Sequence, residues 1–233
     1  MSAALITGGS AGLGLELVRA LAGQGWTVIT DGRNADRLNA ATAALPHVIA
    51  IPGDVTDADH REHLRQAVAD HGRLDLLVHN ASTLGPSPLR PLDTMTVEDL
   101  RTVWQSNVGA PLVLTATLLP ALRAAGGVLV SISSDAAIEH YEGWGLYGAS
   151  KAGLDHVTLT YGQEAGLTAY AIDPGDMRTQ MHQDAFPGED ISDRPLPESV
   201  VPHLLGLLAQ RPPSGRYKAA DFAAVHAPAT QGV

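Results

Sequence analysis

Short apolar runs alternate with longer amphipathic stretches along most of the chain. The short runs are rich in β-branched residues and leucine and end near Gly, Asp or Ser, which is typical of strands. The stretches between them repeat apolar residues every three to four positions, as helices do. The pattern predicts strands at Ala3–Thr7, Thr27–Asp31, Val48–Ile51, Leu74–His79, Gly127–Ser133 and Leu167–Ile172.

This alternation of strands and helices predicts an α/β fold with a doubly wound parallel sheet of the Rossmann type. A length of 233 residues fits one domain, so residues 1–233 are assigned to a single unit. Ligands of such sheets bind beyond the carboxyl ends of the strands. The segment 176–197 follows the last predicted strand and contains several Pro and Gly residues, which indicates a loop long enough to serve as a substrate lid.

Composition and charge exclude several kinds of partner. The chain has 25 acidic and 15 basic residues, a net charge of -10, and no cluster of Lys and Arg, so we expect no nucleic acid partner. It has no cysteine, which excludes disulfides and thiolate zinc sites. No basic N-terminal leader is visible, and the apolar run "PLVLTATLLPAL" is interrupted by Pro120 and too short for a bilayer. We expect a soluble cytoplasmic protein without a membrane partner.

The ten histidines raise the question of a metal site. His60 and His63, three residues apart in a helical pattern, are the best pair, but neither a third ligand nor an HExxH motif accompanies them. An exposed polar helix face accounts for them better, so no metal is expected.

The stretch "TGGSAGLG", Thr7 to Gly14, joins the first predicted strand to a helix. Its glycines allow a tight turn in which backbone N–H groups approach an anion. The helix dipole favours negative charge at that end, so a pyrophosphate would rest there. On the first strand of a βαβ pattern, such a turn indicates a dinucleotide site.

The stretch "YGASK" places Tyr147 and Lys151 four residues apart, on one face of a predicted helix. A free phenol has a pKa of about 10, which is too high for a base near neutrality. A nearby ammonium, together with any positive charge on a bound dinucleotide, would favour the phenolate and lower that pKa. The pair is therefore predicted to donate a proton to a carbonyl, or to accept one from an alcohol.

The spacing T-G-x-x-x-G-x-G together with Y-x-x-x-K resembles the short-chain dehydrogenase/reductase family, over residues 3 to about 180. "GDVTD" and "DPGDMRT" agree with it, whereas "HNAS" carries His79 and Ser82 where the family usually has N-N-A-G. The resemblance implies that a nicotinamide dinucleotide contacts Gly8, Ser10, Gly12, Leu13, Gly14, Arg33, Asp54, Val55, Asn80, Ala81, Tyr147, Lys151, Pro174, Gly175 and Thr179.

The same resemblance implies the catalytic roles. Tyr147 would be the acid/base, Lys151 would tune its pKa and bind the ribose, and Ser134 would anchor the substrate oxygen. Asn107 would kink its helix and support a proton relay through water. Pro111 gives a physical cause for a kink, because it lacks the N–H that would bond to the carbonyl of Asn107, although simple packing would also explain one.

The end of the second strand, "TVITDGRN", bears on the choice of cofactor. A carboxylate there would bind both ribose hydroxyls of NAD, whereas an Arg pairs with the extra phosphate of NADP. Aligned on the family pattern, Gly32 occupies the acidic position and Arg33 follows it, which favours NADP(H). In a rival alignment Asp31 is the ribose ligand, which would favour NAD(H).

These observations predict an NADP(H)-dependent oxidoreductase that interconverts a carbonyl and a secondary alcohol. A sensor or scaffold that binds NADP(H) without turnover is the alternative, and a lyase or dehalogenase with the same catalytic residues is a third. The resemblance implies a homodimer or homotetramer. The identity of the small-molecule substrate is left open: an apolar substrate pocket or ordinary packing would equally explain Trp144, Leu146, Met181 and Phe186.

Overall fold

The fold is that of a computed structural model, which describes residues 1–225; residues 226–233 of the predicted domain lie outside the described part. It contains a seven-stranded parallel sheet with the strand order β3-β2-β1-β4-β5-β6-β7. The chain forms the α/β architecture that the alternating pattern predicts. The strands are β1 (Ala3–Ile6), β2 (Thr27–Gly32), β3 (Val48–Pro52), β4 (Leu76–His79), β5 (Val128–Ile132), β6 (Thr168–Asp173) and β7 (Gly215–Lys218).

The sequence pattern missed β7, the strand at the edge of the sheet. Its four residues, "GRYK", contain one aromatic and no aliphatic residue, and none of them is fully buried. The strand is defined by its pairing with β6, where Tyr170 lies opposite Gly215 and Asp173 opposite Lys218. Because pairing to a neighbour rather than its own apolar content creates this strand, hydrophobic alternation could not reveal it.

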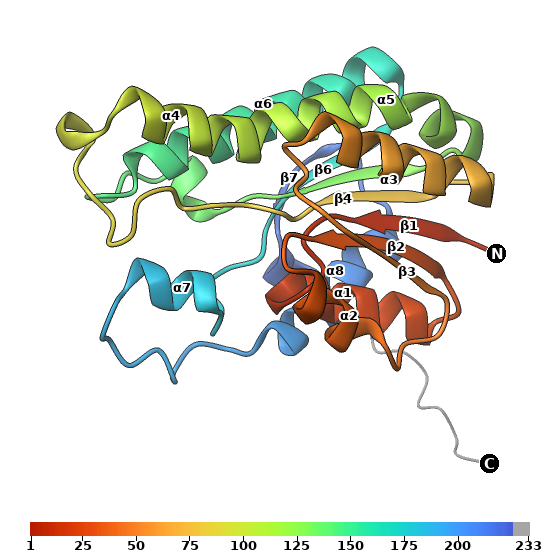
Figure 1. The fold of residues 1–233 in the computed structure, drawn as a ribbon, viewed down its shortest axis with the longest axis horizontal. Helices are drawn as coiled ribbons and strands as arrows, with labels where there is room; N and C mark the ends of the chain where they lie inside the picture. The colour runs from red at the N-terminus through yellow and green to blue at the C-terminus, as the bar shows by residue number, and fades with distance from the viewer. Residues whose placement is uncertain (226–233) are drawn as a thin grey trace.

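Helices cover both faces of the sheet (Figure 1). One layer contains α1, α2 and α8, and the other contains α3, α4, α5 and α6. Residues alternate between two cores: Ala4 and Ile6 of β1 pack in the cluster with α1 and α8, whereas Leu5 packs with α3 and α5. The helices are α1 (Gly12–Gly23), α2 (Ala35–Thr42), α3 (Ala58–His71), α4 (Val97–Trp104), α5 (Ala110–Ala125), α6 (Gly145–Ala165), α7 (Gln180–Ala185) and α8 (Pro197–Gln210).

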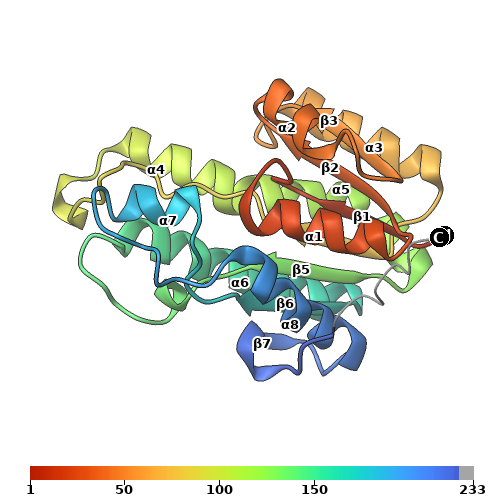
Figure 2. The same cartoon turned by 90° about the horizontal axis from the view of Figure 1, so that it is seen from below.

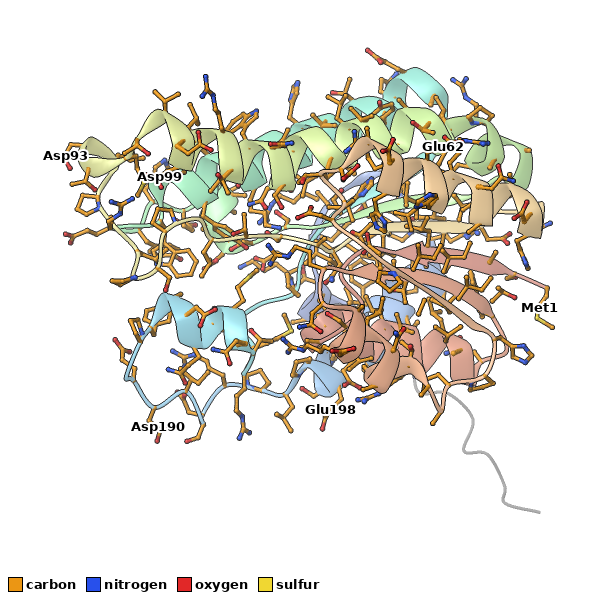
Figure 3. The ribbon with its side chains drawn as sticks, viewed as in Figure 1. Met1, Glu62, Asp93, Asp99, Asp190 and Glu198 are labelled. Carbon is orange, nitrogen blue, oxygen red and sulfur yellow. The ribbon has the colours of Figure 1, made fainter. Side chains whose placement is uncertain are left out.

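The helical segment that contains α4 and α5 follows the helical spacing of apolar residues over 96–126. Residues 97–125 form one continuous run, joined by a π-turn at Gln105–Gly109, and Pro120, which interrupts the apolar run of the sequence, lies inside α5. By length and apolar composition alone this run could cross a membrane. However, α5 buries Leu114, Leu118 and Leu122 against the sheet, as a core helix does. At the start of the run, Thr96 and Asp99, the latter labelled in Figure 3, form a capping box.

The carboxyl ends of the strands meet at one edge of the sheet, where the chain order reverses between β1 and β4. Seen from below in Figure 2, the segment that follows β6, including α7, extends past this edge toward the end of α4. The topology therefore places the glycine turn, α6 and the segment 176–197 around one region.

His79 ends β4 in the interior of the protein. It is 2% exposed, and its Nε2 lies 2.6 Å from Thr115 Oγ1. Its Nδ1 has no hydrogen-bond partner among the described residues. Because burial penalises the charged imidazolium, the pKa of His79 is lowered to about 3.

This burial predicts an acid-sensitive contribution to stability. The unfolded chain takes up a proton at His79 as the pH falls below about 6.5, whereas the folded chain does not, so stability present above that pH is lost toward pH 3. His79→Asn removes the titration. From pH 7 to pH 5, the variant should lose about 2 kcal/mol less free energy of unfolding than the wild type. Urea unfolding at both pH values measures this, and equal losses would contradict it.

Candidate active site

A cleft of about 690 Å³ opens at the carboxyl edge of the sheet. Two of the predicted residues do not line it: Gly14 lies beneath the glycine turn, and Asn107 lies behind the wall. The structure thus brings segments far apart in the sequence to one surface. The predicted residues that line the cleft are Gly8, Ser10, Gly12, Leu13, Arg33, Asp54, Val55, Asn80, Ala81, Ser134, Tyr147, Lys151, Pro174, Gly175 and Thr179.

The glycine turn forms a cradle at the start of α1. Gly8 and Gly12 have φ values of 74° and 55°, which L side chains rarely adopt. The N-cap residue, Ala11, provides no side-chain hydrogen bond, so the first N–H groups of the helix have no such partner. This arrangement fits the pyrophosphate of a dinucleotide, which would rest on the N-terminus of α1.

Close packing behind the turn explains Gly14. A Cβ atom there would collide with the Nδ2 atom of Asn80 and the carbonyl oxygen of Gly8. The amide of Asn80 donates to the carbonyl oxygens of Thr7, at 2.8 Å, and Gly8, at 3.2 Å. Gly14 therefore lets the turn sit on Asn80, and its contribution to the cleft is indirect.

Asp31, the ribose ligand of the rival alignment, is held by other protein groups. The residue is 2% exposed; its Oδ1 accepts a 2.6 Å hydrogen bond from the Gly8 N–H, and its Oδ2 lies 3.1 Å from His60 Nε2. The prediction of an exposed polar face was wrong for His60, which is 5% exposed. His60, Leu64 and Val68 form the buried stripe of α3, a spacing of four residues that could have indicated this burial.

The end of β2 does not present a free carboxylate that could bind both ribose hydroxyls of NAD. A Cβ atom on Gly32 would lie 3.0 Å from Ser10 Cβ, so a larger side chain there would have to displace Ser10. Arg33 and Arg37 both line the cleft at this end. Burial acts to raise the pKa of Asp54, but hydrogen bonds from Thr56 and the charge of Arg33 lower it overall. Arg37 was not among the predicted residues.

At the other end of the cleft, α6 carries Tyr147 and Lys151. The amine of Lys151 donates a 2.8 Å hydrogen bond to the carbonyl of Ile132 and lies 5.5 Å from the centre of the Tyr147 ring. Lys151 is 2% exposed, and burial lowers its pKa to about 8 against the opposing attraction of Asp155. The amine therefore lies beside the phenol, as the spacing of four residues predicts.

The prediction that Lys151 lowers the pKa of Tyr147 is not met by the structure. Burial raises the pKa of Tyr147 well above its ordinary value, and the charges of Asp135 and Asp173 act in the same direction. The hydroxyl groups of Ser82 and Ser134 oppose this shift. The reason is that the phenol is 7% exposed while the nearby amine is bonded to a backbone carbonyl, so desolvation dominates.

Ser134 lies between β5 and the short turn Asp135–Ala137. Its hydroxyl donates to Asp135 Oδ1, at 3.0 Å, and accepts from the Ala136 N–H, at 3.2 Å. Ser131 and Ser133 bond instead to Thr158 and Asp155, as strand-end packing groups. Of the three serines near the end of β5, Ser134 is therefore the one whose hydroxyl contacts the Tyr147 phenol. The Ser82 hydroxyl also contacts this phenol, although the family pattern does not include a serine there.

Asn107 lies in the π-turn between α4 and α5, which is the irregularity that Pro111 predicts. Its side chain is fully buried, and both its amide oxygen and its amide nitrogen are hydrogen-bonded. Oδ1 accepts from the Thr83 N–H and the Ser82 hydroxyl, and Nδ2 donates to the Thr83 carbonyl and Ser150 Oγ. Asn107 thus fastens the segment after β4, including Ser82, to α6.

An apolar cluster borders the phenol on the side of the segment 176–197. The Trp144 ring centre lies 5.6 Å from that of Tyr147 and 5.9 Å from that of Phe186. Trp144 and Met181 line the cleft, whereas Leu146 is buried. Ser87 Oγ donates to the carbonyl of Asp184, at 2.6 Å, which joins α7 to the opposite wall.

Comparisons with known proteins agree with this geometry. A profile described as short chain dehydrogenase matches residues 2–190. The uncharacterized oxidoreductase YciK of Escherichia coli is 33% identical over 88% of this chain and 84% of its own length. A serine 3-dehydrogenase of Agrobacterium fabrum is 35% identical over 76% of this chain and 72% of its own. A short chain dehydrogenase structure from Shigella flexneri, complexed with NADP, has a TM-score of 0.83 and 31% identity, covering 94% of this chain and 97% of that one.

The contact between Asp31 and His60 predicts a large loss of stability in His60→Leu. The change leaves a buried carboxylate with the Gly8 N–H and without its imidazole partner. We expect the free energy of unfolding at pH 7.5 to fall by about 2–3 kcal/mol. Urea denaturation measures this, with His63→Leu as the control from the same helix. His63 is exposed, and its replacement should change the value by less than about 0.5 kcal/mol. Equal effects of the two changes would contradict the interpretation.

Proposed function

The chain belongs to the short-chain dehydrogenase family, and we propose that it is an NADP(H)-dependent oxidoreductase that interconverts a carbonyl and a secondary alcohol. One observation carries the proposal: a single cleft has an uncapped helix N-terminus and Arg33 at one end, and Tyr147, Lys151 and Ser134 at the other. A dinucleotide bound along the cleft would span these two ends. When bound there, a nicotinamide would supply or accept the hydride.

In the proposed mechanism, Tyr147 holds the proton. Its high pKa keeps the phenol protonated near neutral pH, which is the form that donates a proton to a carbonyl oxygen during reduction. The Ser134 hydroxyl, close to the same phenol, would donate a second hydrogen bond to that oxygen and stabilise the developing charge. Lys151 would bind the ribose and, as a cation, favour the phenolate that forms.

The choice of NADP(H) is supported by the groups around the end of β2. Arg33 and Arg37 line the cleft and would attract the additional phosphate. The carboxylate of Asp31, which would favour NAD(H), is bonded to Gly8 and His60. The relative from Shigella flexneri, crystallised with NADP, also agrees with this choice.

A sensor that only binds NADP(H) is the alternative, and the catalytic end of the cleft argues against it. Such a protein would need neither an acid/base phenol nor a hydroxyl beside it. Tyr147, Lys151 and Ser134 lie together at one end of the cleft, which supports turnover.

We also propose that residues 176–197 act as a substrate lid in this single domain. The Arg178 N–H bonds to the carbonyl of Pro195, which joins the two ends of the segment.

The proposed assembly is a homodimer or homotetramer in the cytoplasm, acting on a small carbonyl or alcohol. Half-exposed apolar side chains on α4 and α5, namely Leu100, Trp104, Leu112 and Val113, support pairing of subunits.

Tyr147→Phe should abolish carbonyl reduction while largely preserving cofactor binding. Loss of the proton donor is expected to reduce kcat by about 100-fold to 10,000-fold. NADPH affinity, measured by fluorescence titration, should change by less than about threefold, because the phenyl ring still fills the site. The matched control is Tyr161→Phe on the same helix, whose hydroxyl bonds to the Leu112 carbonyl. Retained activity in Tyr147→Phe would overturn the mechanism.

Arg33→Ala should weaken NADPH far more than NADH. Loss of a charge-assisted contact to a phosphate corresponds to roughly a tenfold to hundredfold rise in KM for NADPH. The KM for NADH should be nearly unchanged. Arg65→Ala, at a half-exposed arginine of α3 paired with Glu62, controls for general loss of positive charge. An unchanged cofactor preference in Arg33→Ala would refute the assignment of Arg33.

A further inference from the structure

Three ionisable side chains follow one another along α6 at intervals of one turn: Tyr147, Lys151 and Asp155. All three are at least nine-tenths buried, with exposures of 7%, 2% and 7%. Asp155 therefore adds a buried carboxylate one helical turn beyond Lys151, and its charge acts on the amine. An isolated buried carboxylate is costly, so its partners determine how it acts on the amine.

Arg216 of β7 provides the main partner of Asp155. Its Nε lies 3.1 Å from Asp155 Oδ2, which also accepts a 2.8 Å hydrogen bond from Ser133. The same guanidinium donates from Nη2 to the carbonyl of Ser134, at 2.8 Å, and lies 3.7 Å from Asp173. Arg216 thus reaches from the edge strand to Ser134, which belongs to the proposed catalytic end of the cleft.

The carboxylate of Asp155 is incompletely satisfied by these contacts. Its second oxygen, Oδ1, is buried and has no hydrogen-bond partner among the described residues. Burial raises the pKa of Asp155, whereas Ser133, Arg216 and Lys151 all act to lower it. The negative charge of Asp155 therefore interacts with two cations, Arg216 and Lys151.

We propose that Arg216 is a positioning residue that acts through Asp155 to govern how firmly Lys151 holds its positive charge, a role that builds on the proposed function of Lys151. Arg216 lies beyond residue 190, where the match to the family profile ends. It also belongs to the strand that sequence periodicity does not reveal. The assignment therefore comes from the contacts of β7 with α6 and the end of β5.

The direction of the effect follows from the charges around Lys151. Asp155 attracts the ammonium. Arg216 is bonded to the same carboxylate, so we expect its positive charge to weaken that attraction. Without Arg216, the attraction of Asp155 for the ammonium should strengthen, because the competing cation is gone. Without Asp155, the ammonium loses its nearby anion. The charged or titratable groups at this end of the cleft come from four elements. Tyr147 and Asp155 of α6 lie nearest the amine, and Arg216 of β7 contacts Asp155 and Asp173 of β6. Asp135, in the turn after β5, and Asp173 act on Tyr147.

The chain contains only two lysines, Lys151 and Lys218, so the titration of Lys151 can be observed directly by NMR of lysine-labelled protein. In the wild type the Lys151 signal should titrate near pH 8. Arg216→Gln, which keeps a donor for the Ser134 carbonyl but removes the charge, should raise this midpoint by roughly one pH unit. Asp155→Asn should lower it by a similar amount.

Two further variants act as controls. Arg216→Lys keeps the positive charge and should leave the Lys151 midpoint within a few tenths of a pH unit of the wild type. This variant adds a third lysine signal, which is identified by its absence from the wild-type and Arg216→Gln spectra. Lys218→Gln removes an exposed cation from the same strand; it assigns the remaining signal and should not move it. Thermal unfolding of each variant shows that the comparison is made on folded protein.

The outcomes separate the proposal from its alternatives. Opposite shifts in Arg216→Gln and Asp155→Asn support the proposal, whereas no shift or shifts of one sign would overturn it. Should Arg216→Gln fail to fold, the other two variants test the proposal. It is overturned if Asp155→Asn leaves the Lys151 midpoint unchanged, or if Arg216→Lys shifts that midpoint.

The titration needs neither substrate nor cofactor, so it does not depend on the proposed reaction. In a second arm, the pH profile of kcat/KM for carbonyl reduction is compared between the wild type and Arg216→Gln. A shift of its alkaline limb to higher pH supports both the charge control and the catalytic role of Lys151. If the NMR midpoint moves and the profile does not, the charge control stands and the proposed role of Lys151 in turnover fails.

Discussion

The proposed catalytic end of the cleft depends on keeping an ammonium charged in the interior of the protein. Burial lowers the pKa of Lys151 to about 8, close enough to neutrality that neighbouring charges decide its state. The carbonyl of Ile132 accepts a hydrogen bond from the amine, and Asp155 provides the nearby negative charge. Because the phenol of Tyr147 is itself desolvated, a neutral amine would leave little to favour the phenolate.

Both ends of the cleft are supported by buried carboxylates bonded to a neighbouring segment. At one end, Asp31 joins the glycine turn to α3 through Gly8 and His60. At the other, Asp155 is held by Arg216, which also bonds to the carbonyl of Ser134. In each case a buried carboxylate fixes the backbone that carries the site; Asp31 also lines the cleft, whereas Asp155 lies behind it. Removing one partner leaves a buried charge, which explains why such contacts hold loops firmly.

The sequence was sufficient for the features that depend on local pattern. The six apolar runs became β1 to β6 with small shifts at their ends, and the glycine turn lies before α1 as expected. The sequence pattern was insufficient where contacts between distant segments determine the structure. β7 exists through its pairing with β6, and Arg216 acquires its partners only when that strand is placed. His60 was assigned to an exposed face because its polarity outweighed its position in the stripe with Leu64.

The raised pKa of Tyr147 shows why the four-residue spacing from Lys151 was not enough to predict the protonation of the phenol. A separation of four residues places the amine beside the ring, but it does not fix the balance between attraction and desolvation. Asn107 joins the segment that carries Ser82 to α6, so the hydroxyl groups of Ser82 and Ser134 meet at the phenol. Because these hydroxyl groups lower the pKa of the phenol less than burial raises it, the phenol is held in its protonated form, which the proposed mechanism requires. On this view, the charge on Lys151 matters most when the phenolate forms, which is the step that its buried neighbours support.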